Sequence, residues 1–172
     1  MAAIVATKNT GLMDTLEQAQ TQTIDEFIVT LTTPLRILSE AINTEEAHSE
    51  YEAWAAYCEE KLNMVYERTK DIPMEDRKTV YWGNTWGEEI RSTYALKNRY
   101  YEVYLAGGQL IGPEENSNFP EVTAEQLYSW DPDIIFVDFN GMKLIQEDYA
   151  NNPDFYNALT AMQQGKVYSQ IS

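Results

Sequence analysis

The sequence is poor in the residue types from which enzymatic and metal sites are usually built. It contains one cysteine, Cys58, and one histidine, His48, among 172 residues. A single cysteine excludes an internal disulfide and a cysteine cluster for a metal. A single histidine leaves the usual acid-base arrangements and catalytic triads without their base, and no nucleophile elbow, Walker loop, Gly-x-Gly-x-x-Gly turn or zinc motif occurs. We therefore expect no enzyme, no resident cofactor and no metal site, with His48 exposed to solvent.

Basic residues are scarce as well. Twelve lysines and arginines stand against 28 acidic residues, which gives a formal net charge of -16. Such a charge repels phosphate backbones and anionic lipid surfaces, so we expect no nucleic-acid partner. The chain also lacks an apolar run of the ~20 residues that a membrane span needs, and residues 1–8 lack the basic flank and apolar core of a secretion signal. We expect the protein as given to be soluble.

One stretch, residues 119–139, predicts a helix, a stop and a buried strand. Thr123 followed by Gln126 has the pattern of a capping box at a helix start. Pro132 disfavours the helical conformation at the preceding residue and so ends this helix. The unbroken apolar run 134–137 then predicts a strand that is covered on both faces, as in parallel sheets between layers of helices. The unit indicates an α/β layer fold.

A long amphipathic helix is predicted from Thr44 to Lys70. Its roughly 27 residues would span ~40 Å at the standard helical rise. The chain around it is predicted to alternate between shorter elements. One face of the long helix carries Tyr51, Trp54, Ala55, Cys58, Leu62 and Val65. The other predicted helices are 12–20, 34–43, 92–105, 143–150 and 154–163, and the other strands are 2–7, 26–31, 78–82 and 166–169.

Three stretches carry a resemblance to a known family. Residues 121–127, Glu-Val-Thr-Ala-Glu-Gln-Leu, followed by a Trp and Asp-Pro-Asp-Ile-Ile, resemble the ABC-transporter solute-binding proteins for iron-siderophores, haem and cobalamin. Residues 104–108, Tyr-Leu-Ala-Gly-Gly, resemble the helix end before a Gly-Gly turn of that family, and residues 152–168 resemble its closing helix and strand. The resemblance covers residues 79–169, and its specificity rests on three pieces in the right order.

The resemblance implies a binding protein whose two α/β lobes close around a ligand. At 172 residues the chain is too short for two lobes and a connecting helix. We expect residues 1–43 to be a remnant of the first lobe, 44–70 the connecting helix, and 71–172 the carboxyl-terminal lobe. That lobe should have three layers, with a central, mostly parallel sheet flanked by helices and the long helix along its side. The resemblance also implies a monomer outside the cytoplasm, with a signal or lipoprotein anchor beyond this sequence.

Ligands of α/β sheets meet the loops at the carboxyl ends of the strands. If the strands 78–82 and 134–137 are parallel, the loop 83–87 and the turn 138–142 lie on one rim. Aromatic, amide and hydroxyl groups suit metal chelates and sugars alike, and the resemblance favours a chelate, namely an iron-siderophore, haem or a corrinoid. Two of the candidate residues have an equally simple structural explanation, because Trp86 could be a buried ring in a turn and Arg91 could form a surface salt bridge. The predicted ligand contacts are Tyr81, Trp82, Asn84, Trp86, Arg91, Tyr94 and Asn140.

The same resemblance implies an ABC permease in the membrane as the protein partner. Each lobe of that family presents a carboxylate to the permease, and Glu125 is the matching position, although a carboxylate in a first helical turn also has a local role. Two other classes stay open at this point. One is an aromatic-lined carbohydrate-binding or adhesion module, which a β-sandwich or an exposed row of Trp would favour. The other is an α/β enzyme fragment whose acid-base residues lie elsewhere.

Overall fold

A computed structural model describes residues 23–84, 93–95, 100–112, 121–137 and 139–169. The strands in these ranges form one six-stranded sheet in the order β4-β2-β1-β5-β6, with β3 also paired to β1. Pairing of β1 with β3 and β5, and of β5 with β6, is parallel, whereas β2 pairs antiparallel with β1 and β4. The sheet is mostly parallel, as predicted. Its strands are β1 (Lys78–Asn84), β2 (Thr93–Ala95), β3 (Gly108–Ile111), β4 (Glu121–Val122), β5 (Ile134–Val137) and β6 (Val167–Ser169).

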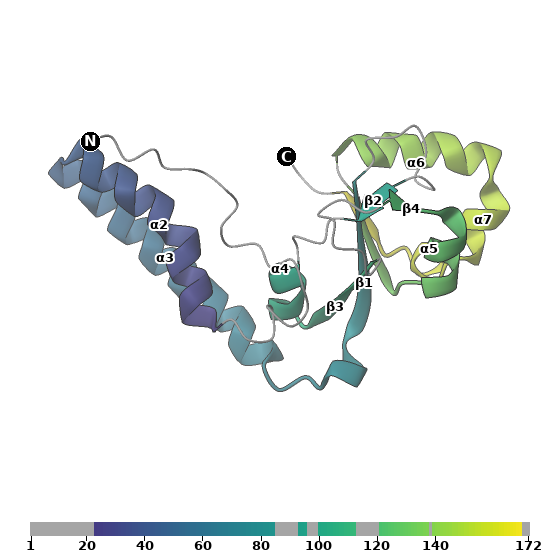
Figure 1. Ribbon diagram of the computed structural model, residues 1–172, viewed down its shortest axis with the longest axis horizontal. Coiled ribbons are helices and arrows are strands. Elements are labelled where there is room, and N and C mark those ends of the chain that lie inside the picture. The colour runs from purple at the N-terminus through teal and green to yellow at the C-terminus, as the bar shows by residue number, and fades with distance from the viewer. Residues whose placement is uncertain (1–22, 85–92, 96–99, 113–120, 138, 170–172) are drawn as a thin grey trace.

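Helices lie on both faces of this sheet (Figure 1). One face is covered by α5 (Ala124–Trp130), α6 (Phe139–Asn151), α7 (Pro153–Ala158) and α8 (Thr160–Gln163), and the other carries α4 (Tyr100–Leu105). The predicted three-layer α/β fold is confirmed. The main core, on the side of α5 to α8, consists of Tyr81, Val122, Leu127, Ile135, Val137, Tyr156, Leu159 and Ala161. A smaller core under α4 consists of Val80, Val103 and Leu110.

The unit from α5 to β5 forms as the sequence predicts. The Thr123 hydroxyl accepts a hydrogen bond from the Gln126 N–H at 3.2 Å, and the Thr123 N–H donates to Gln126 Oε1 at 2.9 Å. These two bonds satisfy backbone donors that the first turn of α5 would leave unpaired. The helix ends at Asp131, whose left-handed backbone (φ 39°) turns the chain into β5.

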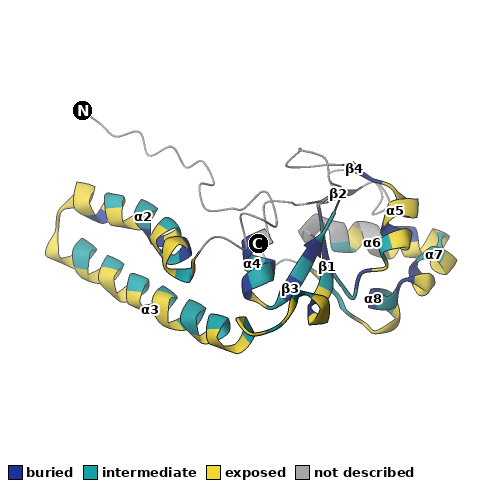
Figure 2. Cartoon of the chain, turned by 60° about the horizontal axis from the view of Figure 1, so that its bottom comes forward, coloured by how far each residue is buried: buried dark blue, intermediate teal, exposed yellow. Residues whose placement is uncertain are grey.

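Two long helices, α2 (Ile24–Ile42) and α3 (Glu45–Thr69), form a hairpin that projects away from the sheet (Figure 1). The predicted long helix is therefore present as α3. It does not lie along the side of the sheet, as we expected, because it packs against α2 and, near its end, against α4. The contact of the helical hairpin with α4 is centred on Phe27 of α2 and on Tyr101 and Leu105 of α4. Figure 2 shows that buried residues gather on the strands and the helices beside them, while α2 and α3 are largely exposed.

Arg77 fastens the end of α3 to the sheet. Its buried guanidinium donates to the carbonyls of Ile72 (3.1 Å), Tyr104 (2.7 Å), Gly108 (3.4 Å) and Thr69 (3.3 Å). It also lies 4.1 Å from the centre of the Tyr104 ring. One side chain thus joins α3, β1, α4 and β3, which holds the helical hairpin at a defined angle to the lobe.

Several predicted elements need correction. Residues 26–31, predicted as a strand, belong to α2, because Thr23 and Glu26 form a capping box that starts a helix there. Pro34, expected to start a helix, lies inside α2. Residues 93–95, predicted as helix, form β2, and the helix predicted at 154–163 is divided at Leu159 into α7 and α8. The elements predicted at 2–7 and 12–20 lie outside the described residues.

Candidate ligand rim at the carboxyl edge of the sheet

The parallel strands end together at one edge of the sheet. Gly83 pairs with Val137, and Val137 pairs with Ser169, so β1, β5 and β6 reach this edge at the same level. Asn84 is the last residue of β1, and Asn140 lies in the first turn of α6, three residues beyond the end of β5. The sequence placed Asn140 in a turn, and the structure includes it in the helix. The predicted shared rim of Asn84 and Asn140 follows from this parallel pairing.

Tyr94 joins this rim by a route that the sequence did not indicate. We expected it on a helix, but it lies in β2, where its backbone pairs with Asn84. On the other side of β2, Tyr94 pairs with Glu121 of β4. The antiparallel pairing therefore sets Asn84, Tyr94 and Glu121 in one row across the edge. Glu121 is a rim position that we missed, since nothing in the sequence shows that 121–122 pairs with 93–94.

Two predicted ligand contacts are placed away from the rim. The Tyr81 side chain is fully buried in the main core, with its ring centre 6.3 Å from that of Trp130. Trp82 points to the opposite face, where its half-buried ring stacks on Phe136 at 4.9 Å. Successive residues of a strand point to opposite faces, and both of these positions precede the strand end. Tyr81 and Trp82 therefore belong to the packing of the sheet. Trp86 and Arg91 lie outside the described residues.

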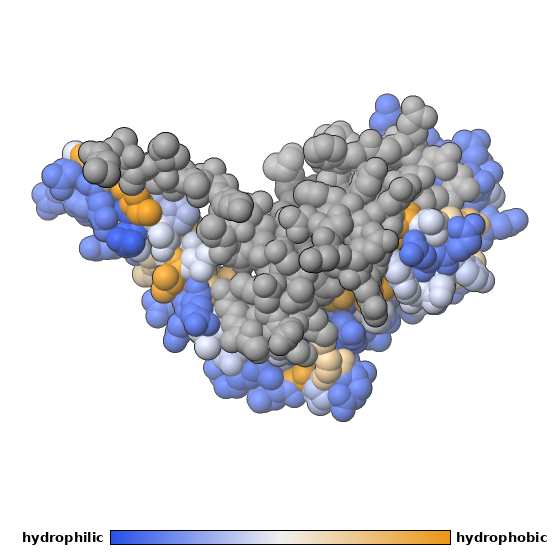
Figure 3. Space-filling model, in the orientation of Figure 1, coloured by the Kyte–Doolittle hydropathy of each residue, from blue (hydrophilic) through white to orange (hydrophobic). Residues whose placement is uncertain are grey.

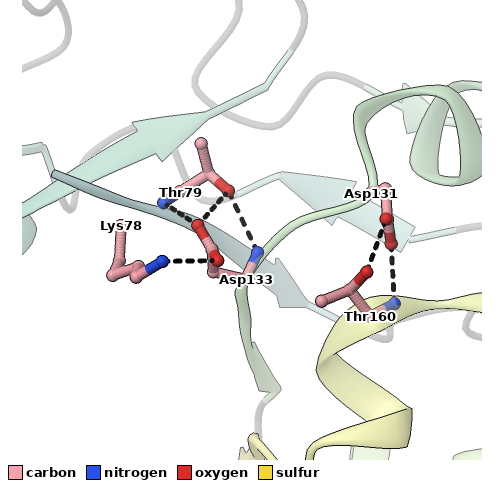
Figure 4. Close-up of polar contacts among 5 residues, drawn as sticks. All are labelled: Lys78, Thr79, Asp131, Asp133 and Thr160. Atoms are coloured by element: carbon pink, nitrogen blue, oxygen red, sulfur yellow. Dashed lines mark hydrogen bonds and ion pairs between the residues drawn. The ribbon is translucent and has the colours of Figure 1, made fainter. Parts of the chain in front are cut away.

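Two aspartates hold the α5–β5 connection in place at the amino end of β5, away from the rim (Figure 4). Asp131 accepts hydrogen bonds from the Thr160 N–H at 2.7 Å and the Thr160 hydroxyl at 2.6 Å. Asp133 accepts from the Thr79 N–H at 3.0 Å, the Thr79 hydroxyl at 3.1 Å and Lys78 Nζ at 3.1 Å. In the sequence these residues belong to Asp-Pro-Asp, from which we predicted a helix end and a family resemblance but not these contacts. Their carboxylates tie the start of β5 to β1 and to α8.

Electrostatics favour the charged form of Asp133. Partial burial opposes ionisation and would raise the pKa of this carboxyl, but the hydrogen bonds from Thr79 and Lys78 outweigh it, so the pKa lies below its usual value. The carboxylate therefore accepts all three bonds throughout the neutral range.

Glu125 is exposed, and its helix starts at the rim. Glu121 stands level with Asn84 across β2, and α5 begins two residues after β4 ends. The first turn of α5, which contains Glu125, therefore lies near the rim, and the helix runs away from it (Figure 1). A carboxylate at this position is accessible to a partner that approaches the side of the sheet where the strands end.

An apolar groove of about 460 Å³ lies on the face of the sheet that carries α4. Its walls include Val80, Trp82, Ile134 and Phe136 from the strands and Val103 from α4. Its polar side chains, Lys78 and Glu102, come from β1 and α4. Apolar walls of this kind suit apolar groups better than the oxygen-rich surface of most iron chelates. We therefore place the candidate ligand site at the rim and not in this groove.

His48 has a structural partner in the α2–α3 hairpin. His48, which we expected to be exposed, is half-buried, and its Nδ1 lies 2.8 Å from Ser39 Oγ across the α2–α3 hairpin. Within the described ranges, no cluster of three or more His, Cys, Asp or Glu side chains is arranged to hold a metal ion. No helix in those ranges has both the length and the apolarity to cross a bilayer.

Comparison with known proteins matches this arrangement to one family. A family model described as periplasmic binding protein matches residues 8–170, nearly the whole chain. The chain belongs to the periplasmic binding protein family. Members of this family bind substrates and are not enzymes, which confirms our prediction that no catalysis occurs. The resemblance seen in the sequence is confirmed at this level.

Individual relatives are longer than this chain. The Fe(3+)-citrate-binding protein YfmC of Bacillus subtilis is 25% identical over 146 residues, which are 85% of this chain and 42% of that protein. Among solved structures, a solute-binding protein of an ABC transporter from Sulfurospirillum deleyianum superposes with a TM-score of 0.65 at 23% identity, over 82% of this chain and 42% of its own. The vitamin B12-binding protein BtuF of Vibrio cholerae superposes with a TM-score of 0.58 at 19% identity, over 89% and 54%. The chain thus spans about half the length of these relatives.

Proposed function

We propose that this chain is part of an extracytoplasmic solute-binding protein that binds a metal chelate and delivers it to an ABC importer. The observation that carries the proposal is the match to the periplasmic binding protein family over residues 8–170. The name of the B. subtilis relative, an Fe(3+)-citrate-binding protein, supports an iron chelate. Solved neighbours include proteins for ferric hydroxamate, vitamin B12 and haem, which belong to the classes of chelate that we predict.

The rim offers groups that suit such a ligand. Amides at positions 84 and 140 and the hydroxyl of Tyr94 provide hydrogen-bond donors for the carboxylate or hydroxamate oxygens of a ferric chelate. The predicted contacts Trp86 and Arg91, which lie outside the described residues, would add an aromatic surface and a bidentate partner for carboxylates. We propose these five residues as ligand contacts. Donors of this kind are needed here, because a net charge of -16 otherwise repels an anionic chelate.

The ligand assignment is tested by titration of the full-length gene product, since half a cleft supplies only part of the contacts. Tryptophan fluorescence is followed while ferric citrate, a ferric hydroxamate, haemin or cyanocobalamin is added. We expect one of these to quench the signal at micromolar concentration. Quenching by none of them would remove the metal chelate from the proposal.

The rim assignment is tested with the ligand found in that screen. Asn84→Ala and Asn140→Ala should each weaken binding about 10- to 100-fold, which is the effect of losing a hydrogen bond to a charged group. Asn151→Ala is the matched control, because Asn151 is exposed at the opposite end of α6. Unchanged affinity in both rim variants, with ligand still bound, would move the site elsewhere.

We propose further that Glu125 contacts the permease. Its exposure and its place in the first turn of α5, near the rim, support this role. The measurement is uptake by cells whose only copy of the binding protein carries Glu125→Gln, together with ligand affinity of the purified variant. Uptake should fall while affinity stays unchanged. Glu59→Gln, on exposed α3, serves as the control, and normal uptake with Glu125→Gln would contradict the docking role.

The observed fold does not favour the carbohydrate-binding alternative. The described strands form a mostly parallel sheet and not a β-sandwich. The described tryptophans, Trp54, Trp82 and Trp130, are half-buried on three different elements, so they form no exposed row.

A further inference from the structure

Tyr128 stands on α5 as an exposed side chain without a contact of its own. It is 56% exposed, and within the described ranges its side chain has neither a hydrogen bond nor a ring contact. A phenol ring in this position presents an apolar body and a polar tip to a partner. The other exposed tyrosines of these ranges each have a neighbour, namely Lys61 at Tyr57, Asn157 at Tyr149 and Phe136 at Tyr168.

Tyr128 shares one face of α5 with Glu125. The two residues are three positions apart, so they stand about 60° apart around the helix axis and about 5–6 Å apart at Cβ. Leu127, which is fully buried, holds the inner face of the helix in the main core. Both ends of α5 are fixed as well, by the capping box at Thr123 and by the hydrogen bonds of Asp131. We call Glu125 and Tyr128 the α5 patch, and its orientation is set by the fold.

The surroundings of the α5 patch are polar. Figure 3 shows a mostly hydrophilic surface over the described helices α5 to α7, whereas apolar side chains reach the surface on the α2–α3 hairpin. Small, polar contact surfaces are typical of transient complexes, while permanent ones bury large apolar areas. Under the proposed function the protein has to leave the permease after each delivery. A patch of one charge and one ring suits such a contact.

The chemistry of the α5 patch indicates the group that it recognises. The Glu125 carboxylate attracts a cation, and the net charge of -16 on the whole chain does so too. A guanidinium pairs with a carboxylate through two parallel hydrogen bonds, and its flat face stacks on an aromatic ring. The ammonium group of a lysine has neither the fork of donors nor the flat face. Glu125 and Tyr128 side by side therefore match an arginine best.

We propose that Glu125 and Tyr128 form one docking site for an arginine side chain of the permease. Glu125 contributes the ion pair, and Tyr128 contributes a cation–π contact. An exposed contact of this kind changes an equilibrium constant about 2- to 5-fold, and a desolvated one about 30-fold. The inference rests on the proposed docking role of Glu125, and it adds a second contact residue and the chemistry of the partner group.

Uptake by cells whose only copy of the binding protein is a variant tests the proposal. The transported compound is the one of ferric citrate, ferric hydroxamate, haemin and cyanocobalamin that binds in the titration. Tyr128→Ala and Tyr128→Phe are compared at low expression, where docking limits the rate. Tyr57→Ala is the matched control, because Tyr57 is 59% exposed on α3. Ligand affinity and circular dichroism are measured for each purified full-length variant.

We expect Tyr128→Ala to lower the initial uptake rate about 5- to 30-fold at unchanged ligand affinity, because the ring is lost. Tyr128→Phe should stay within about twofold of wild type, since its ring still stacks on the guanidinium. Tyr57→Ala should leave uptake unchanged. In a Glu125→Gln background, Tyr128→Ala should lower uptake less than it does alone, because both groups hold the same arginine.

The outcomes separate this inference from the function on which it rests. Normal uptake with Tyr128→Ala beside reduced uptake with Glu125→Gln would overturn the role of Tyr128 and leave that of Glu125 standing. An equal loss with Tyr128→Phe would exclude the cation–π contact, and weaker ligand binding by Tyr128→Ala would assign the ring to the ligand site instead. Normal uptake in both Glu125→Gln and Tyr128→Ala, or no uptake that depends on the wild-type protein, would remove the docking role and this inference with it.

Discussion

Replacement of Asp133 tests whether the α5–β5 connection is held by a charged anchor. The carboxylate accepts two bonds from Thr79 in partly buried surroundings, and a third from Lys78, whose side chain is 63% exposed. Hydrogen bonds to charged groups contribute about 1.5–3 kcal/mol, and an ion pair as exposed as that with Lys78 adds no more than about 0.5 kcal/mol. We expect Asp133→Ala to lower the free energy of unfolding by about 2–3 kcal/mol. Asp133→Asn should cost about half as much, since its amide oxygen still accepts from Thr79.

The pH dependence of this loss follows from the lowered pKa of Asp133. A carboxyl whose folded-state pKa is depressed contributes stability above its unfolded value of about 3.9, and that contribution disappears as the pH falls through the folded value. The difference between wild type and Asp133→Asn should therefore be constant from about pH 5 to 8 and shrink below about pH 4.

The assay is urea unfolding followed by circular dichroism at pH 7 and pH 3, together with thermal melts. For a chain of this length, a loss of about 2–3 kcal/mol lowers Tm by roughly 5–10 °C. Lys78→Ala is the control, and it should cost less than about 0.5 kcal/mol because its ammonium group is exposed. An equal loss for Asp133→Asn at both pH values would refute the charged anchor, as would a cost for Lys78→Ala that matches Asp133→Ala.

Three further substitutions test other parts of the lobe. Arg77→Met should lower the free energy of unfolding by about 3 kcal/mol in urea titrations, because it removes the donor of four hydrogen bonds to carbonyls. A loss under about 1 kcal/mol would contradict the role of this junction. Gly108→Ala should lower the free energy of unfolding by about 1–3 kcal/mol, since an added Cβ would lie 2.9 Å from a Val103 methyl. The control is Gly165→Ala, whose Cβ would meet no atom within 4 Å, so that only the left-handed backbone lowers the stability, by about 1 kcal/mol. Equal Tm losses in the two variants would argue against the clash at Gly108. Asp131→Ala should cost about 1–2 kcal/mol by removing the cap of α8, and a Tm equal to that of wild type would exclude this contribution.

The helix–strand unit and the long helix were predictable from sequence because their signals are local. These signals act within a few residues of one another, and each predicts a single structure. The capping box at Thr123 starts a helix, the proline at 132 ends it, and the four apolar residues at 134–137 form a buried strand. The helix α3 likewise follows from Thr44 at its start and a regular apolar face. The short elements failed where a local pattern was ambiguous, as at 26–31, where apolar residues fit a strand as well as the helix that a cap at Thr23 starts.

The rim required the tertiary structure, because a rim is defined by pairing between distant segments. That Asn84 and Asn140 share one edge depends on β1 and β5 being parallel and in register. Tyr94 joins them only through the antiparallel strand β2, and Tyr81 leaves them because its face of the sheet is the one that α5 to α8 cover. The exposure of apolar side chains on α2 could not be predicted from the sequence either. Periodicity shows that a helix has an apolar face, but only the packing of α2 against α3, which includes the Ser39–His48 hydrogen bond, decides which of its side chains point to solvent.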